Sequence, residues 1–192
     1  MFVHLRLHSE FSIIDGTVRV DEAVAAAAAD GQPALALTDF GNLFGAIKFY
    51  KAARDAGVKP VLGAEILLQG LGADDDNASR VLLLVQNTQG YLNLSELLAR
   101  AWTRGVVKAQ ARVHWDWLRE LSEGLILLSG AQAGPIGRVL AQDDGAQAGA
   151  LALQLAEVFP HRFYLELQRA GRPDDEAQVA AAVQLAARLN LP

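Results

Sequence analysis

Apolar positions along the chain follow two spacings, one typical of strands and one typical of helices. Positions 2–7 alternate apolar and polar residues with a period near two, which predicts a strand. Positions 43–56 carry apolar residues at helical spacing, with Gly57 where a helix would stop. The predicted strands are 2–7, 34–38, 61–68, 81–85, 125–128 and 163–167, and the predicted helices are 20–29, 43–56, 91–102, 115–121, 135–142, 146–158 and 174–190.

The order of these elements predicts the fold class. Strands and helices alternate almost throughout, which indicates an α/β fold with a mostly parallel sheet covered by helices. The repeated unit favours a distorted barrel over an open doubly wound sheet, in one domain spanning 1–192. Positions 70–79 are predicted as a surface loop and 103–113 as irregular. In such barrels functional side chains gather after strand ends, and the polar residues found there are His8, Asp15, Asp39 and Asn42, with Glu65 inside the third strand.

Composition narrows the class of protein. Hydrophobic residues make up 52% and charged residues 20%, as in globular proteins. The net charge of -5 argues against a general phosphate-binding surface. Without cysteine, neither a disulfide framework nor a cysteine zinc site can form. We expect no membrane span, because no apolar stretch is long enough; without a signal peptide pattern, the expected location is cytoplasmic.

The first predicted strand and its loop carry candidate chemistry. On a strand, His4, Arg6 and His8 would share one face, and Asp15 follows in a loop ending in Asp-Gly. A His-x-His strand end followed by an Asp-bearing loop is typical of metallohydrolases. Arg6, however, stays protonated and cannot donate a lone pair to a metal. The pattern therefore indicates a metal site in which ligands have been replaced.

Several segments together resemble a known family. Positions 2–16, 34–50, 57–65, 87–94, 123–130 and 171–176 are similar, in order, to the N-terminal PHP (polymerase and histidinol phosphatase) domain of bacterial DNA polymerase III alpha subunits. The resemblance implies a distorted seven-stranded PHP-type barrel that binds a cluster of metal ions in some members. It also implies that the barrel is incomplete here, because its last strand would follow Pro192.

The family's metal ligands can be carried over position by position. Three ligand types are kept, at His8, Asp15 and Glu65. The other positions have lost theirs, and the vestigial metal-site positions are Arg6, His8, Asp15, Phe40, Glu65, Arg80 and Ala131. Two losses are to permanently cationic side chains, which would repel a metal. We expect no bound metal and no catalytic residue. If a metal were bound, its ligands would be His8, Asp15 and Glu65.

The paired loss of ligands and gain of arginines suggests a structural replacement. Asp15 and Glu65 are costly to bury without positive charge. We hypothesise that Arg6, and also Arg80, supply the charge that metals supply in other members, and that Phe40 fills the volume of a lost imidazole. The pocket would then be an ion-pair network.

The resemblance also implies a biological setting. The parent subunit is a DNA-directed DNA polymerase, a nucleotidyltransferase acting in DNA replication, whose palm domain would use Mg²⁺; no such region lies in this chain, which by itself should not polymerise DNA and needs no cofactor. Implied partners are the remaining polymerase domains and a separate proofreading exonuclease subunit, with DNA met only through the parent subunit. An open sheet edge would favour self-association. Alternatives are a metal-dependent phosphoesterase or residual nuclease using His8, Asp15 and Glu65, and a DNA-binding module, which the acidic net charge opposes.

Other conspicuous residues have structural interpretations. His4 is interpreted as a hydrogen-bonded barrel residue, and His114 and His161 as solvated. Trp102, Trp115 and Trp117 are expected in a local core or a packing surface more than in a base-stacking platform. The basic cluster in this stretch could meet DNA or another polymerase domain, and aspartates 74–76 are expected at a solvated loop tip. The basic cluster consists of Arg100, Arg104, Lys108 and Arg112.

Overall fold

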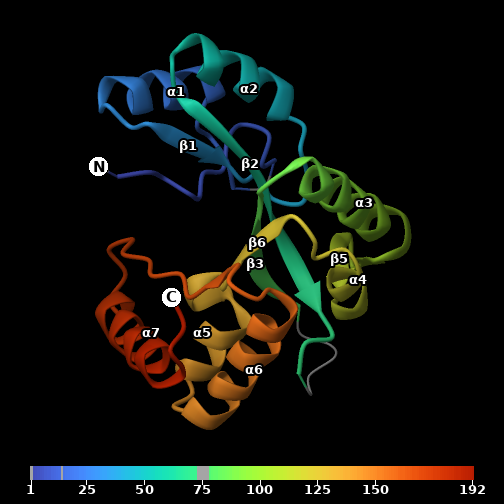
Figure 1. The fold of residues 1–192 in the computed structure, drawn as a ribbon, viewed down its shortest axis with the longest axis vertical. Coiled ribbons are helices and arrows are strands. Elements are labelled where there is room, and N and C mark those ends of the chain that lie inside the picture. The colour runs from blue at the N-terminus through green and yellow to red at the C-terminus, as the bar shows by residue number, and fades with distance from the viewer. Residues whose placement is uncertain (1, 14, 73–77) are drawn as a thin grey trace.

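A seven-stranded sheet forms the centre of the molecule (Figure 1). The computed structural model describes residues 2–13, 15–72 and 78–192. Within these residues the sheet order is β4-β5-β2-β3-β6-β7, and β1 also pairs with β2. The strands are β1 (Ala34–Leu37), β2 (Lys59–Gln69), β3 (Ser79–Val85), β4 (Val106–Val107), β5 (Gln110–His114), β6 (Leu125–Leu128) and β7 (Phe163–Tyr164).

Most strands run in one direction. β1 and β5 are both parallel to β2, and β7 is parallel to β6. β3 is antiparallel to β2 and to β6, and β4 is antiparallel to β5. The strand order does not return on itself, so the sheet is not closed among the described residues. The predicted α/β class, with mostly parallel strands in an incomplete barrel, is confirmed.

Helices cover the sheet in three groups (Figure 1). α1 and α2 lie at one end, α3 and α4 lie along one side, and α5, α6 and α7 lie at the other end. Local signals fix several boundaries: the Asn87 side chain accepts a hydrogen bond from the Gly90 amide at the start of α3, and Pro135 opens α5. The helices are α1 (Val20–Ala29), α2 (Ala46–Asp55), α3 (Thr88–Arg104), α4 (Trp115–Glu120), the 3-10 helix η1 (Ala131–Ala133), α5 (Pro135–Leu140), α6 (Gly145–Val158) and α7 (Asp175–Leu189).

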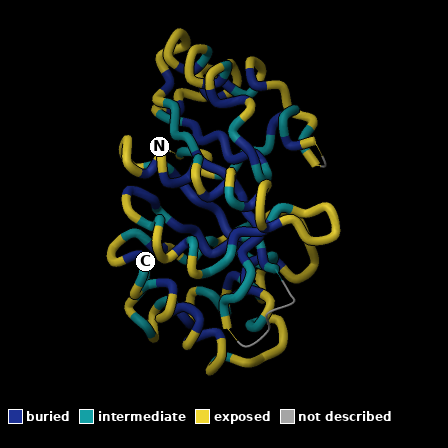
Figure 2. Tube along the Cα trace, turned by 90° about the vertical axis from the view of Figure 1, so that its right-hand side faces the viewer, coloured by how far each residue is buried: buried dark blue, intermediate teal, exposed yellow. Residues whose placement is uncertain are grey.

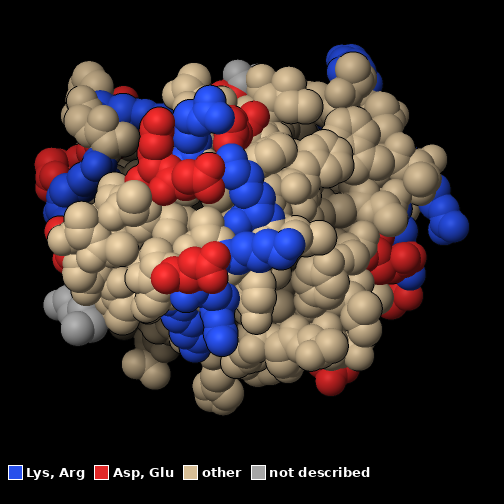
Figure 3. Space-filling view, turned by 90° about the horizontal axis from the view of Figure 1, so that it is seen from above, with Lys and Arg blue, Asp and Glu red and all other residues tan. Residues whose placement is uncertain are grey.

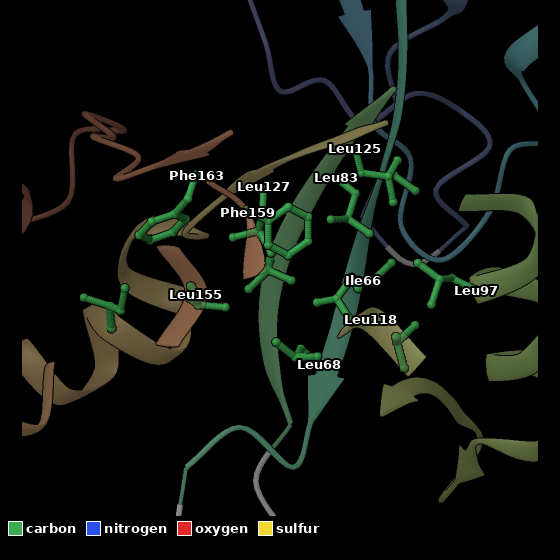
Figure 4. Close-up of a cluster of buried hydrophobic side chains, with 14 of the residues drawn as sticks. Ile66, Leu68, Leu83, Leu97, Leu118, Leu125, Leu127, Leu155, Phe159 and Phe163 are labelled. Atoms are coloured by element: carbon green, nitrogen blue, oxygen red, sulfur yellow. The ribbon is translucent and has the colours of Figure 1, made fainter. Parts of the chain in front are cut away.

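The largest core lies on one face of β2, β3 and β6. Alternate residues such as Ile66, Leu83 and Leu127 point into it, where they meet Leu97 of α3 and Leu155 of α6 (Figure 4). The trace in Figure 2 shows these central strands buried and the periphery exposed. Because strand side chains alternate between faces, the residues between them point the other way. Leu82 and Leu84 form a smaller core there with Leu128, and Glu65 and Arg80 share that second face.

The predicted first strand at positions 2–7 is wrong, because the described residues 2–8 form no strand. The segment does run beside β1, since the amides of Ala36 and Thr38 donate to the carbonyls of His4 and Leu7, both at 2.9 Å. The Leu7 amide, however, donates to the Thr38 side-chain hydroxyl at 2.9 Å. That side-chain bond replaces a backbone bond, so no regular ladder forms.

The stretch predicted as irregular, 103–113, contains the β4–β5 hairpin instead. Its turn lies at Lys108 and Ala109, with φ of 50° and 62°. Glycine and asparagine are the usual residues at such positions, so the sequence carried no turn signal. The predicted strand 163–167 is shorter, since β7 covers only Phe163–Tyr164.

Candidate functional site

Glu65 of β2 is the centre of a cluster of charged side chains. Its own side chain is 1% exposed. Arg6 Nη2 lies 2.6 Å from Oε2, and His8 Nε2 lies 3.2 Å from the same oxygen. Arg80 Nη1 lies 2.9 Å from Oε1. Both carboxylate oxygens are therefore held by cationic or hydrogen-bonding side chains from the N-terminal segment and β3.

Asp15 is the second carboxylate of the cluster. His8 Nδ1 lies 2.9 Å from Oδ1, and Arg80 Nη1 lies 3.2 Å from Oδ2. The imidazole of His8 thus joins Asp15 to Glu65 through its two nitrogens. The Arg80 guanidinium also stacks over the Phe40 ring, 4.6 Å from its centroid. The ion-pair cluster, as we call it, consists of Arg6, His8, Asp15, Phe40, Glu65 and Arg80.

Asp39, at the end of β1, anchors the loop that carries Asp15. Its Oδ1 accepts hydrogen bonds from the Ser9 amide at 2.6 Å, the Ser9 hydroxyl at 3.0 Å and the Ser12 hydroxyl at 2.9 Å. The Phe40 amide in turn donates to the Ser12 hydroxyl at 2.8 Å. At Gly16 a Cβ would come 1.8 Å from the Ser9 carbonyl oxygen, so only glycine allows this loop to fold so tightly. The sequence places Asp39 in a loop after a strand, but it does not reveal this anchoring role.

Glu166, just after β7, was not singled out from the sequence, yet it lies beside the cluster. Its Oε1 lies 3.5 Å from Arg6 Nε, and its amide donates to the Ser129 hydroxyl at 2.9 Å. Ala131 lies near Glu166, where both line a small cavity, rather than among the charged groups. A signal was available, because Glu166 is the one charged residue in the apolar run 163–167.

Burial and neighbouring charges move the pKa values of the cluster. Burial alone would lower the pKa of His8, but Glu65 and Asp15 outweigh it and raise the pKa. Burial alone would raise the pKa of Glu65, yet His8, Arg6 and Arg80 hold it below its ordinary value. The pKa of Asp15 is lowered in the same way by His8 and Arg80. Burial raises the pKa of Glu166, and Arg6 offsets this only in part.

The side chains of this site do not fit the metal cluster that the family implies. Arginine cannot ligate a cation, and two guanidinium groups occupy the oxygens of Glu65 where a metal would bind. Across the described residues, no group of three or more His, Cys, Asp or Glu side chains is arranged to hold a metal ion. The chemistry that this arrangement supports is charge neutralisation of buried carboxylates.

The histidines outside the cluster have different surroundings. The interpretation of His4 as a hydrogen-bonded barrel residue is wrong, because its side chain is exposed and meets the Phe2 ring edge-on. Residues 2–8 form no regular ladder with β1, so His4 is not held on a strand face inside a barrel. His161 is exposed. His114 is half-buried, with its ring 4.6 Å from that of Trp117, so it is less solvated than expected.

The tryptophans and basic residues of the 100–117 stretch separate into two groups. Trp115 and Trp117 pack on the main core as expected, whereas Trp102 is 52% exposed. Arg100 pairs with Glu96 and Glu120, and Arg112 is buried. Only Arg104 and Lys108 of the basic cluster are exposed. Aspartates 74–76 lie outside the described residues.

Among the described helices, none has the length and apolar character that a membrane span requires.

The chain resembles known proteins in both its sequence and its fold. The PHP domain family model matches residues 4–170. The chain is 48% identical over its whole length to DNA polymerase III subunit alpha of Pseudomonas aeruginosa and 46% identical to that of Escherichia coli K12. It spans 16% of the length of each of these curated relatives.

A crystal structure from Bifidobacterium adolescentis, assigned as a metal-dependent phosphoesterase, shares the fold. Its TM-score is 0.54 at 18% identity, over 98% of this chain and 84% of that one. The family model covers far more than half of the chain, and the similarity to the polymerase subunits extends over all of it. The chain therefore belongs to the PHP domain family, and its sequence is similar to the PHP region of DNA polymerase III alpha subunits.

Proposed function

We propose that this chain is the N-terminal PHP domain of a bacterial DNA polymerase III alpha subunit and serves DNA replication as a metal-free structural scaffold. The observation that carries the proposal is the contact of Arg6 and Arg80 with both oxygens of Glu65. In this role the ion-pair cluster stabilises the fold where metals would bind in other members. The chain spans only a small part of its polymerase relatives, so the replicative activity belongs to the proposal too.

The free-energy cost of burying a carboxylate supports the scaffold role. A buried carboxylate such as Glu65 is destabilising unless it is paired and hydrogen-bonded. The cluster connects the N-terminal segment, the loop after it, β2 and β3 through side chains far apart in sequence. Cationic side chains that neutralise this pocket permanently need no metal supply, and they leave no open position for a water nucleophile.

The partners follow from the same assignment. The domain contacts the remaining polymerase domains, which lie in the cytoplasm with it, and docks a separate proofreading exonuclease subunit. Mg²⁺ serves the polymerase domain elsewhere in the parent subunit. Support for these partners comes from similarity to the alpha subunits over the whole chain.

Metal analysis of the purified chain tests the scaffold role. After dialysis against Zn²⁺ or Mn²⁺ and then metal-free buffer, elemental analysis should find well below one ion per chain. The thermal midpoint should be the same with either ion or with a chelator, because no ligand set prefers the folded state. Stoichiometric metal that is lost in a Glu65→Gln variant would instead favour a phosphoesterase using His8, Asp15 and Glu65.

We further propose that the open sheet allows self-association. Strands that end a sheet leave backbone groups available to a second copy, and β4 and β7 end the strand order. At β7 the Leu165 amide already donates to the Pro192 carbonyl at 2.9 Å, which protects part of that edge. Light scattering over a range of concentrations should show a rising dimer fraction; a constant monomer mass at the highest concentration would exclude it.

A further inference from the structure

Large apolar side chains are exposed around the loop that follows β1. Ile13 is 83% exposed, Phe44 is 68% exposed and Trp102 is 52% exposed. Two adjoining hollows of about 550 and 300 Å³ share Gly41, Asn42, Phe44 and Trp102. We name this surface the aromatic groove; besides those shared residues it is lined by Ile13, Phe40, Ala109, Gln110 and Ala111 on one side and Leu43, Tyr91, Ser95, Leu98 and Ala99 on the other.

The aromatic groove is held in place by hydrogen bonds. Asn42 Nδ2 donates to the carbonyls of Phe11 at 3.0 Å and Phe40 at 3.1 Å. Its Oδ1 accepts from the Phe44 amide at 3.0 Å. Trp102 Nε1 donates to the Gly41 carbonyl at 2.7 Å, which fixes the indole of α3 over the loop. The surface is thus preorganised, which reduces the entropy lost when a partner binds.

Charge is unevenly spread over the molecule. On the face seen in Figure 3, charged side chains gather on one part and much of the remainder is uncharged. No residue that lines the aromatic groove is charged. Arg104 and Lys108 lie within two positions of the lining residues Trp102 and Ala109, and both are exposed. In the described part of the chain neither has a salt bridge, whereas nearby Arg100 has two.

We propose that the aromatic groove docks a peptide segment of a partner protein that carries aliphatic or aromatic side chains followed by carboxylates. The apolar side chains would fill the hollows beside Phe44 and Trp102, because exposed aromatics are the usual anchors of such contacts. The carboxylates would pair with Arg104, the last residue of α3, and with Lys108 in the turn between β4 and β5. This deepens the docking role proposed above and rests on it for the existence of a protein partner.

Single-stranded nucleic acid is the other macromolecule that aromatic and basic residues can bind. Such proteins combine stacking side chains with a cationic track along the phosphates. Here the lining is uncharged, and the two cations Arg104 and Lys108 are not among the lining residues. The net charge of -5 also opposes a polyanion. The peptide is therefore the occupant that the surface favours.

A displayed library of random twelve-residue peptides provides the probe. Selection on the 192-residue chain should enrich peptides with Leu, Ile, Phe or Trp next to Asp or Glu. The enriched peptides are then labelled, and their binding is measured by fluorescence anisotropy. Phe44→Ser should weaken binding roughly tenfold or more, which is the loss typical of an interface anchor. Leu153→Ser, at a side chain 53% exposed on α6, is the matched control and should change binding less than about twofold.

A double charge reversal tests whether Arg104 and Lys108 contribute to peptide binding. Arg104→Glu combined with Lys108→Glu should weaken binding several-fold and reduce its dependence on salt, whereas Lys59→Glu, at another exposed cation, should not. Circular dichroism should show all variants folded, since each site is exposed. No enrichment, enrichment of basic peptides, binding unaffected by Phe44→Ser, displacement by oligo(dT), or occupation of the groove by a second copy would each overturn the proposal. If the chain binds stoichiometric metal and still binds these peptides, the metal-free scaffold role is rejected and the docking proposal stands.

Discussion

At the scale of single residues, Glu65 combines deep burial with close contacts to three charged or polar side chains. Three side chains, Arg6, His8 and Arg80, reach its two oxygens. A carboxylate that is 1% exposed and paired this way can belong to a site of catalysis or of stabilisation. Two of its three partners are guanidinium groups, which neutralise charge but accept no proton and bind no metal, and this favours stabilisation over catalysis.

Replacing Glu65 with glutamine should destabilise the fold strongly. The substitution keeps the shape but leaves Arg6 and Arg80 facing a neutral side chain, and removing one partner of a buried pair costs about 3–5 kcal/mol. Urea unfolding followed by circular dichroism measures this change. Glu157→Gln, at an exposed glutamate, should shift the free energy of unfolding by less than about 0.5 kcal/mol. Equal effects at the two positions would contradict a stabilising network.

The sequence predicts which residues meet better than it predicts how they meet. The resemblance to the PHP family supplied the positions, with His8, Asp15 and Glu65 as kept ligand types. Arg6 and Arg80 are replaced ligand positions whose charge the buried carboxylates require. In the sequence Glu166 stands out only as a charge in an apolar run, and its contact with Arg6, 160 positions earlier in the chain, is set by the folded sheet. The exposure of Trp102 was equally hidden, since an apolar side chain looks the same in a core and on a docking surface.

At the scale of elements, local signals work where one residue dominates. Gly57 and Pro135 mark helix ends that the structure keeps, because each restricts or frees the backbone by itself. Predictions fail where tertiary contacts override local preference. The Thr38 hydroxyl interrupts the ladder beside residues 2–8, and Lys108 and Ala109 take positive φ in a hairpin turn without the usual residues.

The loop between the N-terminal segment and α1 depends on one carboxylate from another element. Asp39→Asn replaces one carboxylate oxygen with an NH2 group, which donates hydrogen bonds and cannot accept them. One oxygen then remains for the donors of Ser9 and Ser12 that two oxygens now serve, and the negative charge that strengthens these bonds is lost. We expect a loss of about 1–3 kcal/mol in the free energy of unfolding and faster hydrogen exchange at the Ser9 amide. Asp55→Asn, at an exposed aspartate, should leave both unchanged. Slow exchange at Ser9 in the Asp39 variant would show that the loop is held by other contacts.

At the scale of the whole molecule, the ion-pair cluster links the N-terminal segment, which forms no strand, to the central sheet. Arg6 carries the N-terminal segment to Glu65 in β2 and to Glu166 after β7. The contact between Arg6 and Glu166 thus joins segments near the two ends of the chain (Figure 1). The protonation of a few side chains therefore affects global stability, and each group acts in its own pH range.

Folding stability should be greatest in mildly acidic solution, roughly between pH 4.5 and 6.5, the ordinary pKa values of Glu65 and His8. The pKa values of Glu65 and Asp15 are lowered, so their stabilisation is present above their ordinary values and is lost as the pH falls through the lowered ones. The pKa of His8 is raised, so its stabilisation is complete below its ordinary value and is lost as the pH rises through the raised one. Glu166, with its raised pKa, also favours the folded state less as the pH rises.

Urea unfolding at pH values from acid to weakly alkaline measures this profile, and two variants assign its alkaline side. His8→Gln removes the imidazole charge and should flatten the decline above the ordinary pKa of His8. Glu166→Gln should flatten the part that begins near the ordinary pKa of glutamate, and it should raise stability at neutral pH because a buried, poorly compensated carboxylate is gone. His161→Gln, at an exposed histidine, is the control and should leave the profile unchanged. An alkaline decline that persists undiminished in both variants would show that groups other than His8 and Glu166 cause it, and the pH dependence assigned to their pKa shifts would be wrong.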